Sequence, residues 1–215
     1  MNTWWVYSLG FVAQILFASR LLVQWIVSEK QRKVVTPTAF WMLSLIASVL
    51  LFVYGFLRND LAIMLGQFLT YFIYIRNLQL QHKWHKISAI WRYVILILPS
   101  SLLLYYILNN TIKLSTLLNN PDIPNWLLIL GIISQLIFTL RFVIQWLDSE
   151  KQKISVLPLS FWIISLIGAV MILVYAVFRL DWVLIIGHSF GASIYIRNMY
   201  LHLTDRKLAQ SESIL

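Results

Sequence analysis

The chain has 215 residues, of which 60% are hydrophobic and only 12% are charged, with a formal net charge of +9. Soluble globular domains carry roughly twice that share of charged residues, so the composition excludes an ordinary soluble domain and indicates a membrane protein. There is no cysteine, so cysteine usage does not indicate a redox compartment.

Seven apolar segments are long enough to cross a membrane, whose hydrocarbon core of ~30 Å takes about 20 helical residues. In chain order they are 4–27, 37–57, 61–80, 90–108, 126–147, 158–178 and 182–201. We therefore expect an all-α polytopic membrane protein with seven transmembrane helices.

The segments between seven spans alternate between the two sides of the membrane. Lys and Arg are enriched in cytoplasmic loops, so the side with more basic residues is expected to be the cytoplasm. The N-terminus then lies outside and the C-terminus inside, and the positive charge reflects topology rather than a nucleic-acid partner. The cytoplasmic side receives Lys30, Arg32, Lys33, Lys83, Lys86, Lys151, Lys153, Arg206 and Lys207, and the other side receives Arg58, Lys113 and Arg179.

The sequence repeats itself without a gap at a shift of 121 residues. RLLVQWIVSEKQ at 20–31 returns as RFVIQWLDSEKQ at 141–152, and IYIRN at 73–77 is identical at 194–198. Each copy holds three spans, and 90–108 has no counterpart. A single linking helix gives both copies the same orientation, so we predict two parallel three-helix bundles joined by a linker helix (3+1+3).

This repeat predicts how the chain is divided. We expect a first three-helix repeat, a linker helix with an external loop, a second three-helix repeat and a cytoplasmic tail, at residues 1–82, 83–125, 126–203 and 204–215.

The pentapeptide GHSFG at 187–191 matches the G-x-S-x-G pattern of serine hydrolases, whose nucleophile lies on a strand-to-helix turn. Its repeat counterpart, GQFLT at 66–70, keeps only the first glycine, and both lie inside apolar spans. Small residues there are more typical of close helix packing. Scattered glycines and isolated histidines complete no phosphate loop or metal set, so we predict a protein that is not an enzyme and needs no cofactor or metal.

Arg20 lies eight residues before Ser28, the expected cytoplasmic edge of its span, at a depth of about 12 Å. An arginine at that depth is too far from water to reach it by snorkelling. Intramembrane charges commonly mark functional sites, so we predict that Arg20 and its repeat mate Arg141 bind the phosphate of a substrate. The alternative is a structural clamp, with Glu29 and Glu150 as the partners of the arginines.

Other repeated polar residues complete the predicted site. Gln14 and Gln24 share a helical sector with Arg20, and Asn77 and Tyr74 are suited to line a polar path. Arg76 is a further phosphate candidate, although it lies near enough to the span end to anchor at the interface. With their repeat mates, the remaining candidates for polar or sugar contacts are Gln135, Gln145, Asn198, Tyr195, Trp41 and Trp162, and the remaining phosphate candidate is Arg197.

Several repeated residues are expected to be structural. Proline suits the first turn of a helix, Asp can cap a helix, tryptophan gathers in interfacial belts, and small residues let helices approach. Pro37 and Pro158 are therefore expected in the first turns of their helices, and Asp60 and Asp181 as helix caps. Interfacial belts are expected for Trp25, Trp41, Trp146 and Trp162, with sugar stacking as the alternative. Close helix packing is expected at Ser44, Ala47, Ser48, Ser165, Gly168 and Ala169.

The twice-occurring pattern R-x3-QW-x3-EK, P-x2-FW, R-x-D and Y-x-RN resembles the lipid A biosynthesis N-terminal domain family. The resemblance covers both repeats and implies a bacterial inner membrane protein, lipid-linked sugars and a distant relation to SWEET and SemiSWEET transporters. The chain has no Pro-Gln dipeptide of the kind found in PQ-loop relatives. The glycosyltransferase region that follows this domain in some bacteria is also not among these residues, so its activity does not carry over.

These features predict a transporter or flippase for a phosphate-bearing glycolipid, such as a polyprenyl-phosphate-linked sugar used in lipid A or envelope glycolipid biosynthesis. Arginine suits this substrate because it keeps its charge when desolvated and presents a planar fork of donors. Two alternatives remain. One is a SWEET-like carrier of free sugars. The other is a non-catalytic scaffold that recruits a membrane glycosyltransferase.

Overall fold

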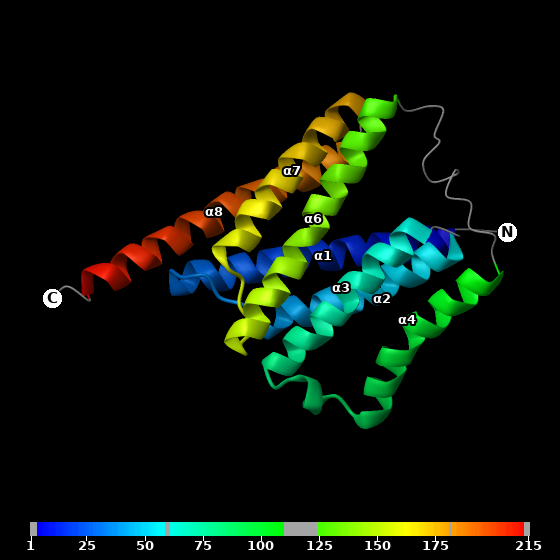
Figure 1. The fold of residues 1–215 in the computed structure, drawn as a ribbon, viewed down its shortest axis with the longest axis horizontal. Helices are drawn as coiled ribbons and strands as arrows, with labels where there is room; N and C mark the ends of the chain where they lie inside the picture. Colours follow the sequence, from blue (N-terminus) through cyan, green and yellow to red (C-terminus); the bar gives the residue numbers. More distant parts are fainter. Residues whose placement is uncertain (1–3, 59–60, 110–123, 181, 213–215) are drawn as a thin grey trace. The chain divides into compact units, whose positions relative to one another are not determined.

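The computed structural model describes residues 4–58, 61–109, 124–180 and 182–212. Over these residues the protein consists of seven long α-helices and one short 3-10 helix (Figure 1). Each of the seven predicted segments corresponds to one helix, which confirms the all-helical prediction. In order they are α1 (Trp4–Gln31), α2 (Thr38–Leu57), α3 (Leu61–Leu80), η1 (Trp84–Lys86), α4 (Ala89–Asn109), α6 (Asn125–Gln152), α7 (Leu159–Arg179) and α8 (Trp182–Glu212).

Five of these helices, α1, α2, α4, α6 and α7, are long and apolar enough to cross a membrane. The third helix of each repeat, α3 and α8, also carries polar residues that face the interior of the protein. In α3, for example, Thr70, Tyr74 and Asn77 are all buried. The helix α8 also continues to Glu212, so most of the segment predicted as a tail is helical (Figure 1).

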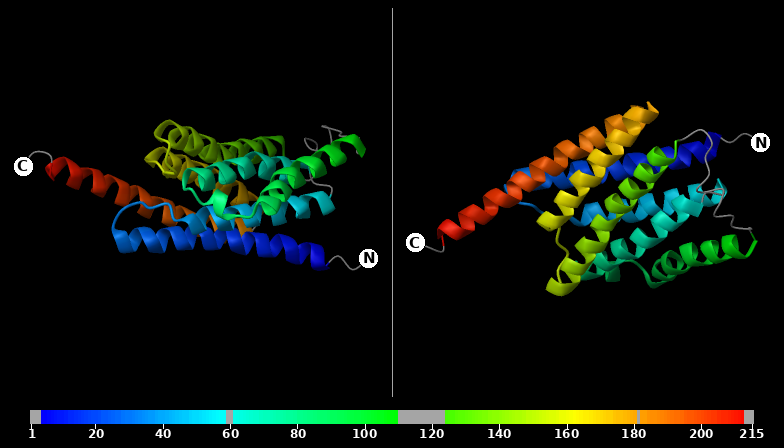
Figure 2. Two further views of the ribbon diagram at one scale, coloured as in Figure 1. Left: turned by 90° about the horizontal axis from the view of Figure 1, so that it is seen from below. Right: turned by 45° about the horizontal axis from the view of Figure 1, so that its top comes forward.

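The chain forms two compact units, and each contains residues from both sequence repeats. Unit 1 comprises Met1–Arg20, Thr38–Asn120 and Lys153–Ser155, and unit 2 comprises Leu21–Pro37, Pro121–Gln152 and Val156–Leu215. The first part of α1 therefore belongs to unit 1 and its last part to unit 2. Within the units, α2 packs against α3, and α7 packs against both α6 and α8, as the two views of Figure 2 show.

Small residues on α2 and α7 allow this close packing, as predicted. Ser44, Ala47 and Ser48 are fully buried on α2. On α7, a Cβ added at Gly168 would lie 3.0 Å from the backbone of Phe138 on α6. The same prediction was wrong for Gly187, where an added Cβ would meet no described atom within 4 Å.

Gly168→Val is expected to lower the free energy of unfolding by about 1–3 kcal/mol, because the new side chain must push α6 away from α7. The matched control is Gly187→Val, which makes the same chemical change in open space. Thermal unfolding in detergent measures both. Equal destabilisation by the two variants would contradict the close α6–α7 approach.

The linker helix α4 packs on unit 1 through an apolar cluster formed by Phe52, Met64, Leu103 and Tyr106. It also contains Pro99, which has no N–H to donate to the carbonyl group four residues earlier. That carbonyl belongs to Ile95, and the Tyr71 hydroxyl on α3 donates to it at 2.6 Å. Tyr71 thus supplies the hydrogen bond that the proline removes from the α4 backbone.

Tyr71→Phe is expected to destabilise unit 1 by about 1–3 kcal/mol, because the Ile95 carbonyl loses its donor. Pro99→Ala should recover much of this loss, since alanine restores a backbone N–H to the same carbonyl. Unfolding of the two single variants and the double variant tests the coupling. Strictly additive effects would show that the tyrosine does not compensate for the proline.

Helix starts differ slightly from the prediction. Pro37 and Pro158 were expected within the first turn, but α2 begins at Thr38 and α7 at Leu159. Pro158 is the N-cap of α7, with an extended ψ of 166°, and its carbonyl accepts from the Phe161 N–H at 3.1 Å. The fixed φ of proline suits that position as well as the first turn. The capping residues predicted for α3 and α8, Asp60 and Asp181, lie outside the described residues.

The hydrolase-like pentapeptide lies in the interior of α8. Residues 187–191 are helical throughout, and the structure has no turn there on which a nucleophile could be held. The backbone carbonyl of Ser189 accepts a hydrogen bond from the Ser193 hydroxyl at 3.1 Å, as expected for regular helix.

Candidate functional site

Arg20 lies in unit 1 and is almost fully buried, with 5% of its surface exposed. Its Nη1 donates to the Ser44 hydroxyl at 2.8 Å and to the Tyr74 hydroxyl at 3.1 Å. Its guanidinium carbon lies 4.6 Å from the ring centroid of Phe17 and 5.2 Å from that of Phe40. The Arg20 cluster, as we call these residues, thus holds a cation among aromatic rings and hydroxyl groups.

Arg141 occupies the equivalent position in unit 2 and is equally buried, with 5% exposed. Its Nη1 donates to the Tyr195 hydroxyl at 3.2 Å. Its guanidinium carbon lies 3.4 Å from the ring centroid of Phe138 and 4.8 Å from that of Phe142. We call these residues, with Trp162 beside Tyr195, the Arg141 cluster. The repeat in sequence is therefore also a repeat in side-chain geometry.

The chemistry of these clusters suits an anion. Aromatic faces attract a desolvated cation, and a guanidinium keeps its charge at low dielectric. The hydroxyl partners described above are neutral acceptors. A phosphate is a stronger partner for guanidinium, because charge-assisted hydrogen bonds are roughly twice as strong as neutral ones. A phosphate oxygen is therefore a stronger acceptor for either guanidinium than the hydroxyl that it bonds in this structure.

Two of the predicted glutamines lie near the ends of α1 and α6, the first helix of each repeat. Gln24 and Gln145 are fully buried. The Gln145 Nε2 donates to the Ser149 hydroxyl and to the Val156 carbonyl, both at 2.8 Å. Gln24 donates in the same way to the Ser28 hydroxyl at 2.9 Å and to the Val35 carbonyl, in the loop after α1, at 3.4 Å. These bonds hold the loop after α1 and the loop after α6 in the same way, so both glutamines have a structural role.

Gln24 also pairs with Asn198 on α8 inside unit 2. Its Nε2 donates to the Asn198 Oδ1 at 2.8 Å, and the Asn198 Nδ2 donates back to the Gln24 Oε1 at 3.2 Å. Asn198 is also fully buried, and it donates to the Ile194 carbonyl at 2.9 Å. This reciprocal amide pair joins a helix of the first repeat to a helix of the second.

Asn77, the repeat mate of Asn198, lies in unit 1 and takes part in a different chain of bonds. The Trp41 Nε1 donates to the Ser155 hydroxyl at 2.8 Å, and that hydroxyl donates to the Asn77 Oδ1 at 2.7 Å. The centroid of the Trp41 ring lies 6.0 Å from that of the Tyr74 ring, so these hydrogen bonds adjoin the Arg20 cluster. Six polar groups, those of Arg20, Ser44, Tyr74, Trp41, Ser155 and Asn77, thus meet around α2 and α3.

The predicted tryptophans divide into two environments. Trp41 and Trp162 are fully buried, so the interfacial-belt interpretation was wrong for both. Neither ring presents a free face on which a sugar could stack in this conformation. Trp146 is 36% exposed and fits a belt position. The depth of a residue along a span does not indicate on which side of the helix its neighbours lie.

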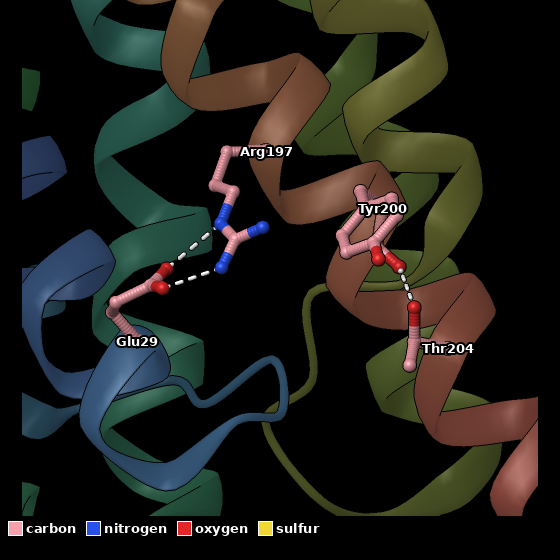
Figure 3. A network of polar contacts seen from close by, with 4 residues as sticks. All are labelled: Glu29, Arg197, Tyr200 and Thr204. Atoms are coloured by element: carbon pink, nitrogen blue, oxygen red, sulfur yellow. Dashed lines mark hydrogen bonds and ion pairs between the residues drawn. The ribbon is translucent and has the colours of Figure 1, made fainter.

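Arg197 on α8 pairs with Glu29 on α1 within unit 2 (Figure 3). The Nε donates to the Glu29 Oε2 at 2.9 Å, and the Nη2 donates to the Oε1. The two side chains are 40% and 42% exposed. Glu29, considered above as a partner for Arg20, is therefore engaged by Arg197, and an exposed pair of this kind contributes little to stability.

The remaining predicted residues lie apart from the buried arginines. Gln14 and Gln135 are exposed, so the structure does not bring them into the Arg20 or Arg141 cluster. Arg76 is half-buried, and its Nη1 donates to the Gln79 Oε1 at 3.1 Å. The phosphate-binding prediction is thus best carried by Arg20 and Arg141.

Sequence reasoning missed some residues that complete the clusters. Ser44 was assigned only to packing, and Ser155 was not singled out. The recurrence of Ser44 as Ser165 was a usable signal, whereas Ser155 has Val34 as its repeat mate and left none.

Residues 9–79 and 130–200 both match the Lipid A Biosynthesis N-terminal domain family. The chain belongs to this family. The two matched segments correspond to the two repeats, so one polypeptide holds two copies of the domain.

Relatives include lipid-A-disaccharide synthases of Chlamydia. The Chlamydia felis (strain Fe/C-56) protein is 31% identical over 217 residues, covering 95% of this chain and 34% of the relative. The Chlamydia pneumoniae protein is 30% identical over 208 residues, covering 94% and 34%. The Chlamydia muridarum (strain MoPn / Nigg) protein is 30% identical over 222 residues, covering 99% and 35%. The chain spans about a third of the length of these curated relatives. No solved structure matches it.

Proposed function

We propose that this Lipid A Biosynthesis N-terminal domain protein is a transporter or flippase for a phosphate-bearing glycolipid, such as a polyprenyl-phosphate-linked sugar, in the inner membrane. The observation that carries the proposal is the pair of equivalent arginines, Arg20 and Arg141, each 5% exposed and each bonded to a tyrosine hydroxyl. The lipid chain would remain in the bilayer while the headgroup crosses. Apolar surfaces on the helices suit that arrangement, since Phe11, Ile97 and Leu136 are exposed.

Energetic considerations favour an anionic headgroup over a neutral one. Placing a charged side chain inside a membrane protein is costly, and a neutral sugar gains little from two guanidinium groups. A phosphate offers each guanidinium a charged acceptor in place of a neutral hydroxyl. Relative movement of the two compact units would give alternating access, as in parallel-repeat transporters.

A second candidate function is a membrane scaffold for a lipid A pathway glycosyltransferase. The observation that favours it is that the relatives bear the name of a disaccharide synthase and this chain matches about a third of them. The segments 28–36 and 149–157, each a helix end with the loop that follows it, would then form the docking surface. This function requires the basic loops rather than the buried arginines.

Purified protein in proteoliposomes tests the first function. The assay measures movement between leaflets of a fluorescent polyprenyl phosphate sugar, with a neutral glycolipid and a soluble sugar as parallel substrates. We expect movement of the phosphate-bearing lipid alone. Uptake of the soluble sugar would instead favour a SWEET-like carrier.

The scaffold function has its own test. Co-purification of a pathway glycosyltransferase with wild-type protein, lost in Arg32→Glu or Lys153→Glu but retained in Arg20→Gln, would support it. If leaflet movement is absent while this pattern holds, the scaffold function replaces the transporter.

A further inference from the structure

Trp162, in unit 2, holds a buried hydrogen-bond donor that the rest of the described chain does not satisfy. Its side chain is fully buried, and its indole Nε1 has no hydrogen-bond acceptor among the described residues. Buried polar groups nearly always find a partner, because an unmade hydrogen bond in the interior is costly. A persistent exception needs a physical reason.

The first repeat provides a matched comparison. Trp41 and Trp162 are repeat mates in almost the same surroundings: the first lies 6.0 Å from the Tyr74 ring at an interplanar angle of 37°, and the second lies 6.1 Å from the Tyr195 ring at 40°. The Trp41 N–H, however, donates to Ser155 at 2.8 Å. Only one of two equivalent indoles is therefore satisfied.

The sequence explains this difference at one position. The residue at the place of Ser155 in the first repeat is Val34, which has no hydroxyl group. Val34 is half-buried and belongs to unit 2, as Trp162 does. In unit 1 the Ser155 hydroxyl passes its own hydrogen bond to the Asn77 amide oxygen. The amide oxygen of Asn198, the repeat mate of Asn77, accepts from Gln24 instead. Unit 2 thus lacks the hydroxyl that completes the equivalent series of hydrogen bonds in unit 1.

We infer that the Trp162 indole N–H donates to an acceptor oxygen of the bound headgroup, and that the two repeats therefore have different roles. This inference rests on the function proposed above. Trp162 lies beside Tyr195, whose hydroxyl accepts from Arg141, so the donor adjoins the candidate phosphate site of the Arg141 cluster.

The asymmetry has an energetic consequence for transport. When the packing around a cluster opens, the Trp41 N–H must break its bond to Ser155 before it can contact a ligand. The Trp162 N–H has no internal hydrogen bond to break, so the full free energy of its hydrogen bond to the ligand contributes to binding. The headgroup oxygen is either that of the phosphate or that of the adjoining sugar, and both accept an indole N–H.

Three substitutions separate this role from packing. Val34→Ser introduces the hydroxyl found at Ser155 and offers Trp162 an internal acceptor. Val34→Ala makes a similar reduction in size without the hydroxyl and serves as the matched control. Trp162→Phe removes the donor and keeps an aromatic ring. Binding of polyprenyl phosphate and of a polyprenyl phosphate sugar is measured in nanodiscs, together with the indole N–H signal of Trp162 by NMR.

We expect the Trp162 signal to shift on addition of either lipid, and Val34→Ser and Trp162→Phe each to weaken binding by roughly tenfold. Val34→Ala should bind like the wild type, and Val34→Ser should be at least as stable as Val34→Ala. If only the sugar-bearing lipid shifts the signal, the acceptor is a sugar oxygen. If polyprenyl phosphate, which carries no sugar, also shifts the signal, the acceptor is a phosphate oxygen.

Two results would overturn the inference in distinguishable ways. If wild type binds the lipids, but the Trp162 signal does not move and Val34→Ser and Trp162→Phe bind equally well, the inference fails and the proposed function stands. If no variant and no wild-type protein binds either lipid, the proposed function fails and the inference fails with it.

Discussion

Arg20→Gln and Arg141→Gln are each expected to lower the affinity for a polyprenyl phosphate by at least about tenfold, because each removes a charge-assisted hydrogen bond to the phosphate. Glutamine keeps a polar amide but is neutral and shorter than arginine, so it removes the charge together with the reach of the guanidinium. Lysine at either position should give an intermediate loss, since it keeps the charge but not the planar fork. Leaflet movement in proteoliposomes should fall in the same order.

The matched control for these variants is Arg197→Gln, which removes an exposed arginine bonded to Glu29. Because exposed ion pairs contribute about 0–1 kcal/mol, this variant should fold normally and bind lipid nearly as well as wild type. If Arg20→Gln and Arg141→Gln unfold the protein while folded lysine variants bind lipid like wild type, the arginines are structural clamps and the phosphate hypothesis is wrong.

Asn198→Leu is expected to cost about 2–4 kcal/mol of unfolding free energy, the largest effect on stability that we predict. The substitution removes both bonds of the reciprocal pair and leaves the Gln24 amide buried with fewer partners. Both residues are fully buried, so water cannot replace the lost bonds. Unfolding of the single variant in detergent measures the loss.

Gln24→Leu combined with Asn198→Leu should be more stable than the sum of the single changes, because the double variant leaves neither amide without the other. Gln135→Leu is the control, since Gln135 is exposed and should tolerate the change. Additive losses in the double variant would show that the pair contributes no coupling.

Much of this fold could be predicted because the relevant signals are local. An apolar segment of about 20 residues can satisfy its backbone in a membrane only as a helix, and all seven predicted segments are helical. The shift of 121 residues, which carries Arg20 to Arg141, also predicted that the two arginines have equivalent surroundings. The depth of the arginines within apolar segments could also be predicted, because it is a property of one helix.

The site could be predicted only in part, because contacts between helices depend on rotation and crossing angle. Gln14 and Gln24 lie on neighbouring sectors of α1, yet one is exposed and the other is fully buried. Helical spacing predicts which side of its own helix a residue lies on, but it does not predict where the neighbouring helices pack. The ion pair between Arg197 and Glu29 could not be predicted for the same reason.

Differences between the repeats were also hard to interpret from sequence. Agreement between copies draws attention to Arg20, Trp41 and their mates, whereas a mismatch such as Val34 against Ser155 resembles neutral variation. Its significance depends on the Trp41 N–H donating to Ser155. The structure shows that the Trp41 indole N–H has an acceptor and that the Trp162 indole N–H has none among the described residues.

The most direct test of the central claim is a structure of the protein in a lipid bilayer with a polyprenyl phosphate sugar bound. We predict phosphate density within hydrogen-bond distance of the Arg20 or Arg141 guanidinium, with the Tyr74 or Tyr195 hydroxyl displaced from that arginine. A lipid bound elsewhere, with both arginines still on their tyrosines, would contradict the claim.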